Sequence, residues 1–192
     1  MKTLDRLKML IERNGGFVNA HAHFDRAYTA QTSDFETNRV NAHLFEKWEL
    51  VNNFKSQASE ERYYNHISEA IYNQIKMGVT AGLTFIDVDP ISETKALHAA
   101  LKAKKDWKDQ FDLKIACQTL QGVCDPEPRK WFEENAFKCD ILGGLPKKDK
   151  GREAEHIDIL LSTAKTHNQR VHVHVDQMNS AEEKETELLA RK

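Results

Sequence analysis

Five short β-rich runs, separated by helical patterns over most of the chain, constrain the fold more than any other feature of this sequence. The runs cover residues 16–21, 79–88, 113–119, 140–143 and 170–176. From the second run onward they recur roughly every thirty residues, which is the length of one βαβ unit. Apolar residues at helical spacing lie between them, as expected for helices that cover a sheet. The pattern predicts an α/β fold with a parallel sheet.

Length and charge narrow the class of protein. The chain has 192 residues, of which 40% are hydrophobic, enough for a single domain (1–192) with its own core. A net charge of −2 lacks the basic excess typical of proteins that bind nucleic acid or anionic membranes, so we expect neither partner. Charges interrupt residues 2–13, where a signal peptide needs an apolar run, and we expect a cytoplasmic protein. Three cysteines without a C-x-x-C pair are expected to be buried thiols: Cys117, Cys124 and Cys139.

Two H-x-H pairs are the strongest candidates for a functional site. His21/His23 and His172/His174 each lie at the carboxyl end of a predicted strand, where parallel α/β folds place their active sites. Side chains alternate along a strand, so His172, His174 and Asp176 are expected to share one face. The first strand alternates in the same way, with one face formed by Asn19, His21 and His23 and an apolar face formed by Val18, Ala20 and Ala22.

Imidazoles gathered on an inward face favour a bound divalent metal. Burying a polar group without a partner costs roughly several kcal/mol of folding free energy, and a bound cation can serve as that partner. Two imidazoles spaced two residues apart on a strand can reach one ion. Histidine and carboxylate ligands without thiolate suit zinc, iron or manganese, and such an ion activates water for attack on a carbonyl or amidine carbon. Histidines that are merely held by backbone hydrogen bonds are the alternative interpretation.

The connection 26–59 between the first two predicted strands is unusually long. It is polar but contains the aromatic helical pattern LFEKWELVNNF. Long connections inside compact domains are usually functional or disordered, and we interpret this one as a large loop or lid. Trp48 is a candidate for closing over a substrate, and packing against the rim of the fold is its alternative role.

The strand segments resemble those of the amidohydrolase superfamily, in particular its cytosine deaminase-like metal-dependent hydrolases. The resemblance runs in collinear order through GFVNAHAHFDRAYT, GVTAGLTFIDVDP, LKIACQTLQGV, CDILGGLP and RVHVHVDQMN with the following ETELLA. It implies a TIM-type β/α barrel, with about five of the eight βα units present and one metal ion at the carboxyl ends of the strands. It also implies hydrolysis of a non-peptide carbon–nitrogen bond in a small cyclic amide, amidine or heterocycle.

The resemblance assigns candidate roles to individual residues. His21 and His23 match the first two metal ligands of the family, and His174 matches the ligand on the fifth strand. The implied cofactor is one divalent ion, zinc or iron. The implied partner is a small-molecule substrate.

Two positions depart from the family pattern. Gln177 stands where the deaminases carry a proton-shuttling Glu, and an amide does not transfer protons at neutral pH. We therefore expect Gln177 to orient substrate, while Asp176 or a residue outside this chain transfers protons. Cytosine-binding relatives present a Gln after the third strand; the nearest here are Gln118 and Gln121, both out of register, and Gln121 is our candidate substrate contact.

The end of the chain adds a second hypothesis. Ser180 and Glu183 form a capping-box pattern that opens a helix running to Lys192 without a stop signal, which we interpret as truncation. The family also uses a His after the sixth strand and an Asp after the eighth, and the chain ends before both. The alternative to a hydrolase is therefore a catalytically incomplete half-barrel that assembles with another chain. Open strand edges invite pairing, so we expect a homo-oligomer.

Overall fold

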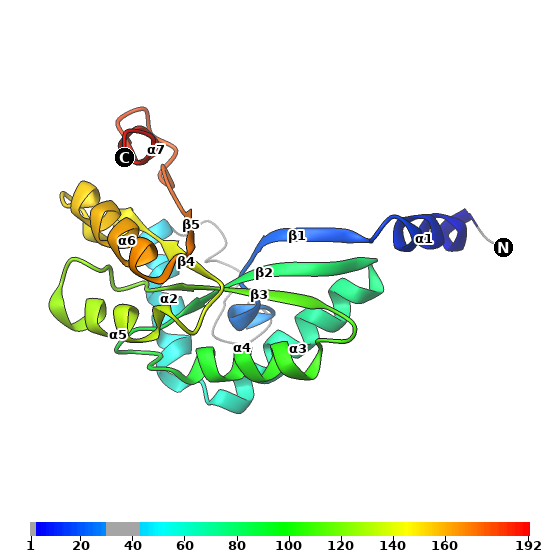
Figure 1. Cartoon of the computed structure of the whole chain (residues 1–192). Coiled ribbons are helices and arrows are strands. Elements are labelled where there is room, and N and C mark those ends of the chain that lie inside the picture. The colour runs from blue at the N-terminus through cyan, green and yellow to red at the C-terminus, as the bar shows by residue number, and fades with distance from the viewer. Residues whose placement is uncertain (1–2, 30–42) are drawn as a thin grey trace.

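The computed structural model describes residues 3–29 and 43–192, and a curled sheet of parallel strands lies at its centre (Figure 1). The strands are β1 (Phe17–Ala22), β2 (Val79–Asp87), β3 (Asp112–Gln118), β4 (Ile141–Gly144) and β5 (Arg170–Val173). They pair in the order of the chain, β1-β2-β3-β4-β5. Sequential order without a reversal is that of a β/α barrel, whereas a doubly wound sheet changes direction at a switch point. The predicted α/β fold, a TIM-type barrel with five of its units present, is confirmed.

Helices precede, link and follow the strands, and most of those that link strands pack against the sheet (Figure 1). They are α1 (Thr3–Arg13), α2 (Leu44–Gln57), α3 (Glu60–Lys76), α4 (Lys95–Asp106), α5 (Pro126–Ala136), α6 (Glu153–His167) and α7 (Glu185–Ala190). The 3₁₀ turns η1 (Phe24–Arg26) and η4 (Pro146–Asp149) follow β1 and β4. No helix of the described residues combines the length and the apolar character needed to cross a bilayer.

The core lies between the sheet and its covering helices. The apolar stripe of α3 contributes Ile67 and Ile71, both fully buried, as the helical spacing predicts. They join residues of the strands, such as Leu113 and Leu142, in one continuous cluster. The predicted burial of the three cysteines is confirmed, and none of them forms a disulfide.

The predicted lid region is partly described. Residues 30–42 of the connection 26–59 lie outside the described residues. The aromatic pattern within it forms helix α2, in which Trp48 and Leu50 are buried. Trp48 packs on Leu120 and Leu145.

The fifth strand is shorter than predicted. It ends at Val173 instead of residue 176, although the amide of His174 still donates to the carbonyl of Gly144 at 2.9 Å. Asp176 has a φ of 50°, which an extended strand does not allow. Its carboxylate accepts hydrogen bonds from the amide of Glu185 at 3.0 Å and from the hydroxyl of Thr186. The expectation that Asp176 shares one strand face with the histidines was therefore wrong.

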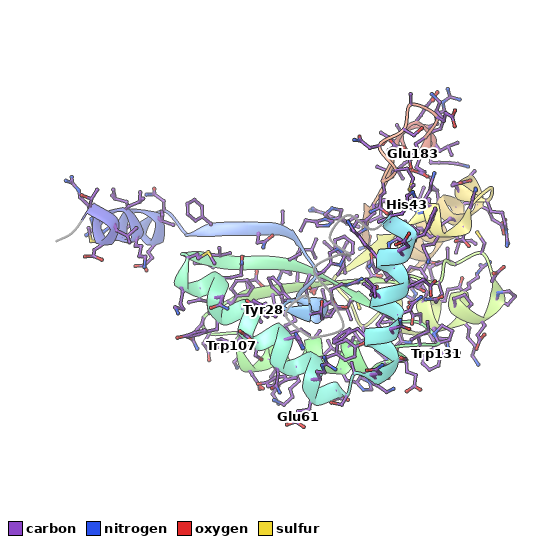
Figure 2. All side chains as sticks on the ribbon, turned by 180° about the vertical axis from the view of Figure 1, so that it is seen from behind. Tyr28, His43, Glu61, Trp107, Trp131 and Glu183 are labelled. Atoms are coloured by element: carbon purple, nitrogen blue, oxygen red, sulfur yellow. The ribbon has the colours of Figure 1, made fainter. Side chains whose placement is uncertain are left out.

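The apolar face predicted for the first strand is not buried along its whole length. Val18 is 69% exposed and Phe17 is 53% exposed. Helix α1 extends beyond β1 and stands apart from the rest of the described chain, and Figure 2 shows the same arrangement from behind. None of the residues of α1 is buried. The prediction failed at Val18 because alternation gives the direction of a side chain but not what covers it.

The C-terminal helix also begins later than predicted. Helix α7 starts at Glu185, five residues after Ser180. The capping-box contact nevertheless forms in part, because the carboxylate of Glu183 accepts from the amide of Ser180 at 3.2 Å. Glu183 also accepts from the amide of Met178 at 3.0 Å, so this carboxylate holds the loop that follows β5.

Candidate metal centre

The curl of the sheet brings histidines from its two edges together. Nε2 of His174, just after β5, lies 3.1 Å from Nε2 of His21 on β1 and 3.3 Å from Nε2 of His23. One ligand atom from each of these three side chains lies within 4.8 Å of the other two. The structure therefore places the three predicted metal ligands at one point, although β1 and β5 are not neighbours in the sheet.

The spacing of these nitrogens fits a divalent ion. Nitrogens bound tetrahedrally at about 2.0–2.1 Å from zinc are about 3.3–3.4 Å apart. A neutral imidazole carries one N–H, so three Nε2 atoms aimed at one point cannot all be satisfied by hydrogen bonds to each other. Burial lowers the pKa of His23 to about 3 and that of His174 to about 4. Both rings are therefore neutral near pH 7, which is the form that binds metal.

A phenyl ring lies beneath the imidazoles. Phe85 of β2 is fully buried, and its ring centroid lies 4.7 Å from that of His21 and 4.4 Å from that of His174. Gly143 on β4 leaves room for the phenyl ring, because a Cβ at this position would lie 2.9 Å from the ring. Phe85 therefore limits how far the imidazoles can tilt into the barrel interior.

A pocket of about 90 Å³ opens beside His23 and His174. The remaining residues that line it form an apolar wall of Trp48, Leu120 and Leu145 and a polar group of Arg26, Gln118 and Gln177. Two predicted site residues, Trp48 and Gln177, thus lie at the pocket. Gln121 is not among the residues that line it, and its amide nitrogen donates to Asn52 Oδ1 at 2.9 Å.

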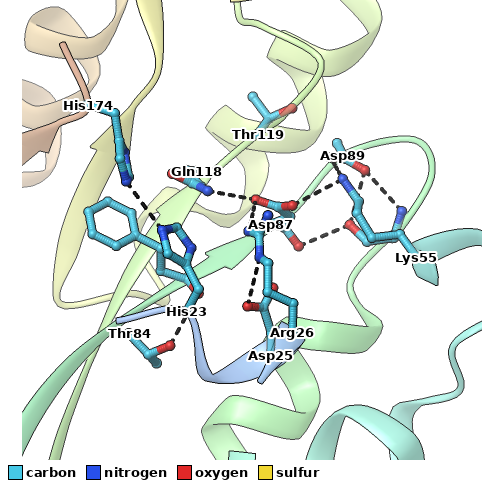
Figure 3. A network of polar contacts seen from close by, with 12 residues as sticks. His23, Asp25, Arg26, Lys55, Thr84, Asp87, Asp89, Gln118, Thr119 and His174 are labelled. Carbon is cyan, nitrogen blue, oxygen red and sulfur yellow. Dashed lines mark hydrogen bonds and ion pairs between the residues drawn. The ribbon is translucent and has the colours of Figure 1, made fainter. Parts of the chain in front are cut away.

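A buried ion network supports one side of this pocket (Figure 3). Asp87, at the end of β2, lies 3.1 Å from the Arg26 guanidinium and 3.2 Å from the Lys55 ammonium. Lys55, on α2, also pairs with Asp89. Burial alone would raise the pKa of Asp87, but Arg26 and Lys55 hold it well below its ordinary value. Asp87 is therefore an anion, and it can only accept hydrogen bonds.

The anion fixes the orientation of a pocket amide. Gln118 is 1% exposed, and its Nε2 donates to Asp87 Oδ1 at 2.8 Å. Its Oε1 is buried and has no hydrogen-bond partner among the described residues. The side-chain amide of Gln118, which lines the pocket, is therefore fixed in one orientation. The reversed orientation would place Oε1 of Gln118 against Oδ1 of Asp87.

Sequence reasoning missed the ion network. Asp87 and Asp89 directly follow a buried strand in the run FIDVDP, and this was the available signal. Lys55 gave no signal, because a lysine in a polar helix is usually solvated. Its partner Asp89 is 34 positions away in the chain.

Comparison with known proteins assigns the chain to a family. No protein-family model matches the chain. It is 45% identical over 185 residues to an uncharacterised protein of Haemophilus influenzae, covering 95% of this chain and 67% of that protein. It is 25% identical over 166 residues to N-isopropylammelide isopropyl amidohydrolase of Pseudomonas sp. strain ADP, covering 83% of this chain and 41% of that enzyme.

A solved structure decides the assignment. The structure of 5-methylcytosine deaminase from Klebsiella pneumoniae, liganded with 5-fluorocytosine, superposes with a TM-score of 0.83 at 25% identity and covers 92% of this chain. This chain belongs to the amidohydrolase superfamily. It spans 43% of the length of the deaminase chain.

The loop after β5 places Asp176 and Gln177, the remaining predicted site residues, in different positions. Gln177 faces the pocket, and its Oε1 is buried without a hydrogen-bond partner among the described residues. Asp176 is bound to the start of α7 instead. The carboxylate of Glu185 returns a hydrogen bond by accepting from the amide of Asp176. The two neighbours in sequence therefore lie in different environments.

Proposed function

We propose that this chain carries the metal centre of a hydrolase that cleaves a non-peptide carbon–nitrogen bond in a small nitrogen heterocycle, cyclic amide or amidine. The observation that carries the proposal is the convergence of three imidazole nitrogens, with separations of 3.1 and 3.3 Å. These distances are close to those between ligands of one tetrahedral ion.

The ion would be zinc or iron, held by His21, His23 and His174. A divalent ion in this position supplies Lewis acidity, which makes water nucleophilic near neutral pH. Imidazoles without thiolates suit both metals. The neutral state of His23 and His174, favoured by their burial, leaves their lone pairs free for the ion.

The pocket residues would bind and orient a flat ring. Trp48, Leu120 and Leu145 offer an apolar wall that excludes water from one side. Gln118 presents a fixed Oε1, so the ring is expected to offer an N–H group at that point. A buried acceptor that stays unpaired costs free energy, and a ligand that pairs it gains selectivity.

Gln177 and Asp176, in the loop after β5, would have different roles. Gln177 faces the pocket and would hold substrate by a hydrogen bond through its Oε1, because an amide does not shuttle protons. A role for Asp176 in proton transfer stays a prediction, since its carboxylate already accepts hydrogen bonds from Glu185 and Thr186.

The relatives support a ring substrate. One is described as an amidohydrolase of N-isopropylammelide, and another is a 5-methylcytosine deaminase liganded with 5-fluorocytosine. The chain spans less than half of each of these enzymes. We therefore propose the class of bond and ring but no individual substrate.

The test is metal analysis combined with a turnover screen. We expect the 192-residue chain to retain about one equivalent of Zn²⁺ or Fe²⁺. We expect His21→Ala and His174→Ala to lose it. His98→Ala, whose side chain is 50% exposed on α4, is the matched control and should retain the ion. Release of ammonia or amine from a panel that includes 5-fluorocytosine and N-isopropylammelide reports turnover. Full metal retention in His174→Ala would contradict the proposal.

A second candidate function has one observation in its favour. Phe17 and Val18 of β1 are exposed apolar side chains, and among the described residues β1 hydrogen-bonds to β2 alone. We propose, as the alternative, a non-catalytic half-barrel that assembles with a second copy through this edge. Sedimentation velocity tests it: a dimer that Val18→Lys dissociates supports the alternative, and a monomer at all concentrations contradicts it.

A further inference from the structure

A fourth histidine contacts the metal centre without joining the convergence of nitrogens. Nε2 of His172, on β5, lies 3.2 Å from Nδ1 of His21. The two rings meet edge to face, with centroids 4.9 Å apart and an interplanar angle of 65°. His172 is absent from the group of three side chains whose ligand atoms lie together. His172 therefore contacts His21 at Nδ1, whereas Nε2 of His21 is directed at the metal point, the position where the nitrogens of His21, His23 and His174 converge.

We propose that His172 is a positioning residue, which holds the His21 ring in the tautomer and orientation that metal binding needs. The inference rests on the proposed function, since it assumes that His21 binds the ion. A ligand that binds through Nε2 carries its proton on Nδ1. That N–H then donates to Nε2 of His172, which accepts with its lone pair and keeps its own proton on Nδ1. Metal-bound histidines usually have such a partner at the second nitrogen.

Neighbouring residues fix the orientation in which the His172 ring accepts this hydrogen bond. Its ring centroid lies 5.0 Å from that of Phe85, the same buried ring that underlies His21 and His174. In the ladder it pairs with Gly143 of β4, which brings no side chain to compete for the space. The ring of His172 is therefore limited on one side by Phe85 and directed towards His21.

The two histidines of the second H-x-H pair thus have different roles. His174 directs Nε2 to the metal point, whereas His172, two residues earlier, directs Nε2 to the far nitrogen of His21. The contact joins β5 to β1 across the open side of the sheet. Removing it leaves the ligand present but free to rotate.

Zinc affinity of the 192-residue chain tests the inference. The dissociation constant for Zn²⁺ is measured by competition with a chromophoric chelator, and the Co²⁺ form gives a visible spectrum of the ligand geometry. We expect His172→Phe to weaken Zn²⁺ binding about 10- to 100-fold, while one equivalent still binds at saturation. His172→Gln retains an acceptor and should recover most of the affinity. His98→Phe is the matched control on an exposed site of α4.

The outcomes separate this inference from the proposed function. Circular dichroism of the metal-free variants first establishes that each is folded. Unchanged Zn²⁺ affinity in His172→Phe overturns the positioning role and leaves the metal centre standing. Two equivalents in the wild type and one in the variant also overturn it, because His172 would then be a ligand. A folded wild-type chain that binds no Zn²⁺ overturns the proposed function and this inference together.

Discussion

The phenyl ring of Phe85 lies against the backbone of Gly143, where an added Cβ would come within 2.9 Å of it. The same Cβ would lie 2.9 Å from Cβ of Gln118. One glycine therefore allows both the floor beneath the imidazoles and the pocket amide to occupy their positions.

Substitution of this glycine should disturb the site through packing. We expect Gly143→Ala to lower the free energy of unfolding by about 1–3 kcal/mol, because both contacts are tighter than van der Waals distance. Urea denaturation of the metal-free chain measures it. In the double variant with Phe85→Leu, the smaller side chain should relieve part of the clash, so the two effects should not add. Additive losses of stability would show that the added methyl group of Gly143→Ala does not clash with Phe85.

Removal of the buried lysine should cost more. Lys55→Met leaves Asp87 and Asp89 with one cation fewer, and breaking a buried ion pair costs about 3–5 kcal/mol. Chemical denaturation should show this loss, and adding Asp89→Asn should restore part of it. Lys95→Met, at a side chain 36% exposed, is the control and should change stability by less than about 0.5 kcal/mol. An equally small effect of Lys55→Met would argue against the ion network.

The pocket amide should control ligand binding and not metal binding. We expect Gln118→Leu to weaken binding of a ring compound identified in the turnover screen at least about tenfold, because an acceptor for a ring N–H is lost. Calorimetric titration of the zinc-loaded chain with that compound measures it. Gln121→Leu removes a hydrogen bond to Asn52 at a residue that does not line the pocket, and it is the matched control. Equal losses in both variants would indicate that Gln118 does not read the ligand.

Stability should depend on pH through a carboxylate remote from the metal. Asp149 accepts hydrogen bonds from Val123 N at 2.8 Å and lies 2.6 Å from Nδ1 of His156. Burial opposes ionisation, but these donors lower the pKa of Asp149 below its ordinary value. A lowered pKa stabilises the folded chain above the unfolded pKa of about 3.9, and that stabilisation disappears as pH falls through the folded value.

Asp149→Asn should therefore matter at neutral pH and less in acid. We expect it to lower the free energy of unfolding by about 1–3 kcal/mol at pH 7, since a charged acceptor is lost. The difference from wild type should shrink as the pH is lowered below about 4. Urea titrations at a series of pH values measure it, with Asp158→Asn, whose side chain is 56% exposed, as the control. A difference independent of pH would contradict the assignment.

Asp176 offers a test between a structural and a chemical role. Its carboxylate accepts from the first amide of α7, so Asp176→Asn should cost about 0.5–2 kcal/mol of stability, as the loss of a helix cap does. Thr186→Val removes the hydroxyl partner of the same carboxylate and should reduce stability in the same direction. If Asp176→Asn instead lowered kcat at unchanged stability while Thr186→Val did not, proton transfer would be its role.

The sequence predicted the parallel α/β fold because the βα rhythm is a local pattern. Alternation and the βα rhythm gave the strands within a few residues, and the motif resemblance pointed to His21, His23 and His174. The end of β5 was missed, because the positive φ of Asp176 accompanies contacts with α7. Lys55 was missed because its burial depends on where α2 packs, which no local pattern records.

The two edges of the sheet share the metal point, and this has a consequence for the chain as a polymer. His21 and His174 are 153 positions apart in a chain of 192 residues, so an ion bound by both would close a loop that contains most of the chain. A link across so long a loop removes much of the freedom of the unfolded chain, by an amount that grows only slowly with loop length. An ion that binds only the folded form also stabilises it by mass action. The bound cation would then stabilise the curled form of the sheet, in addition to any role in catalysis.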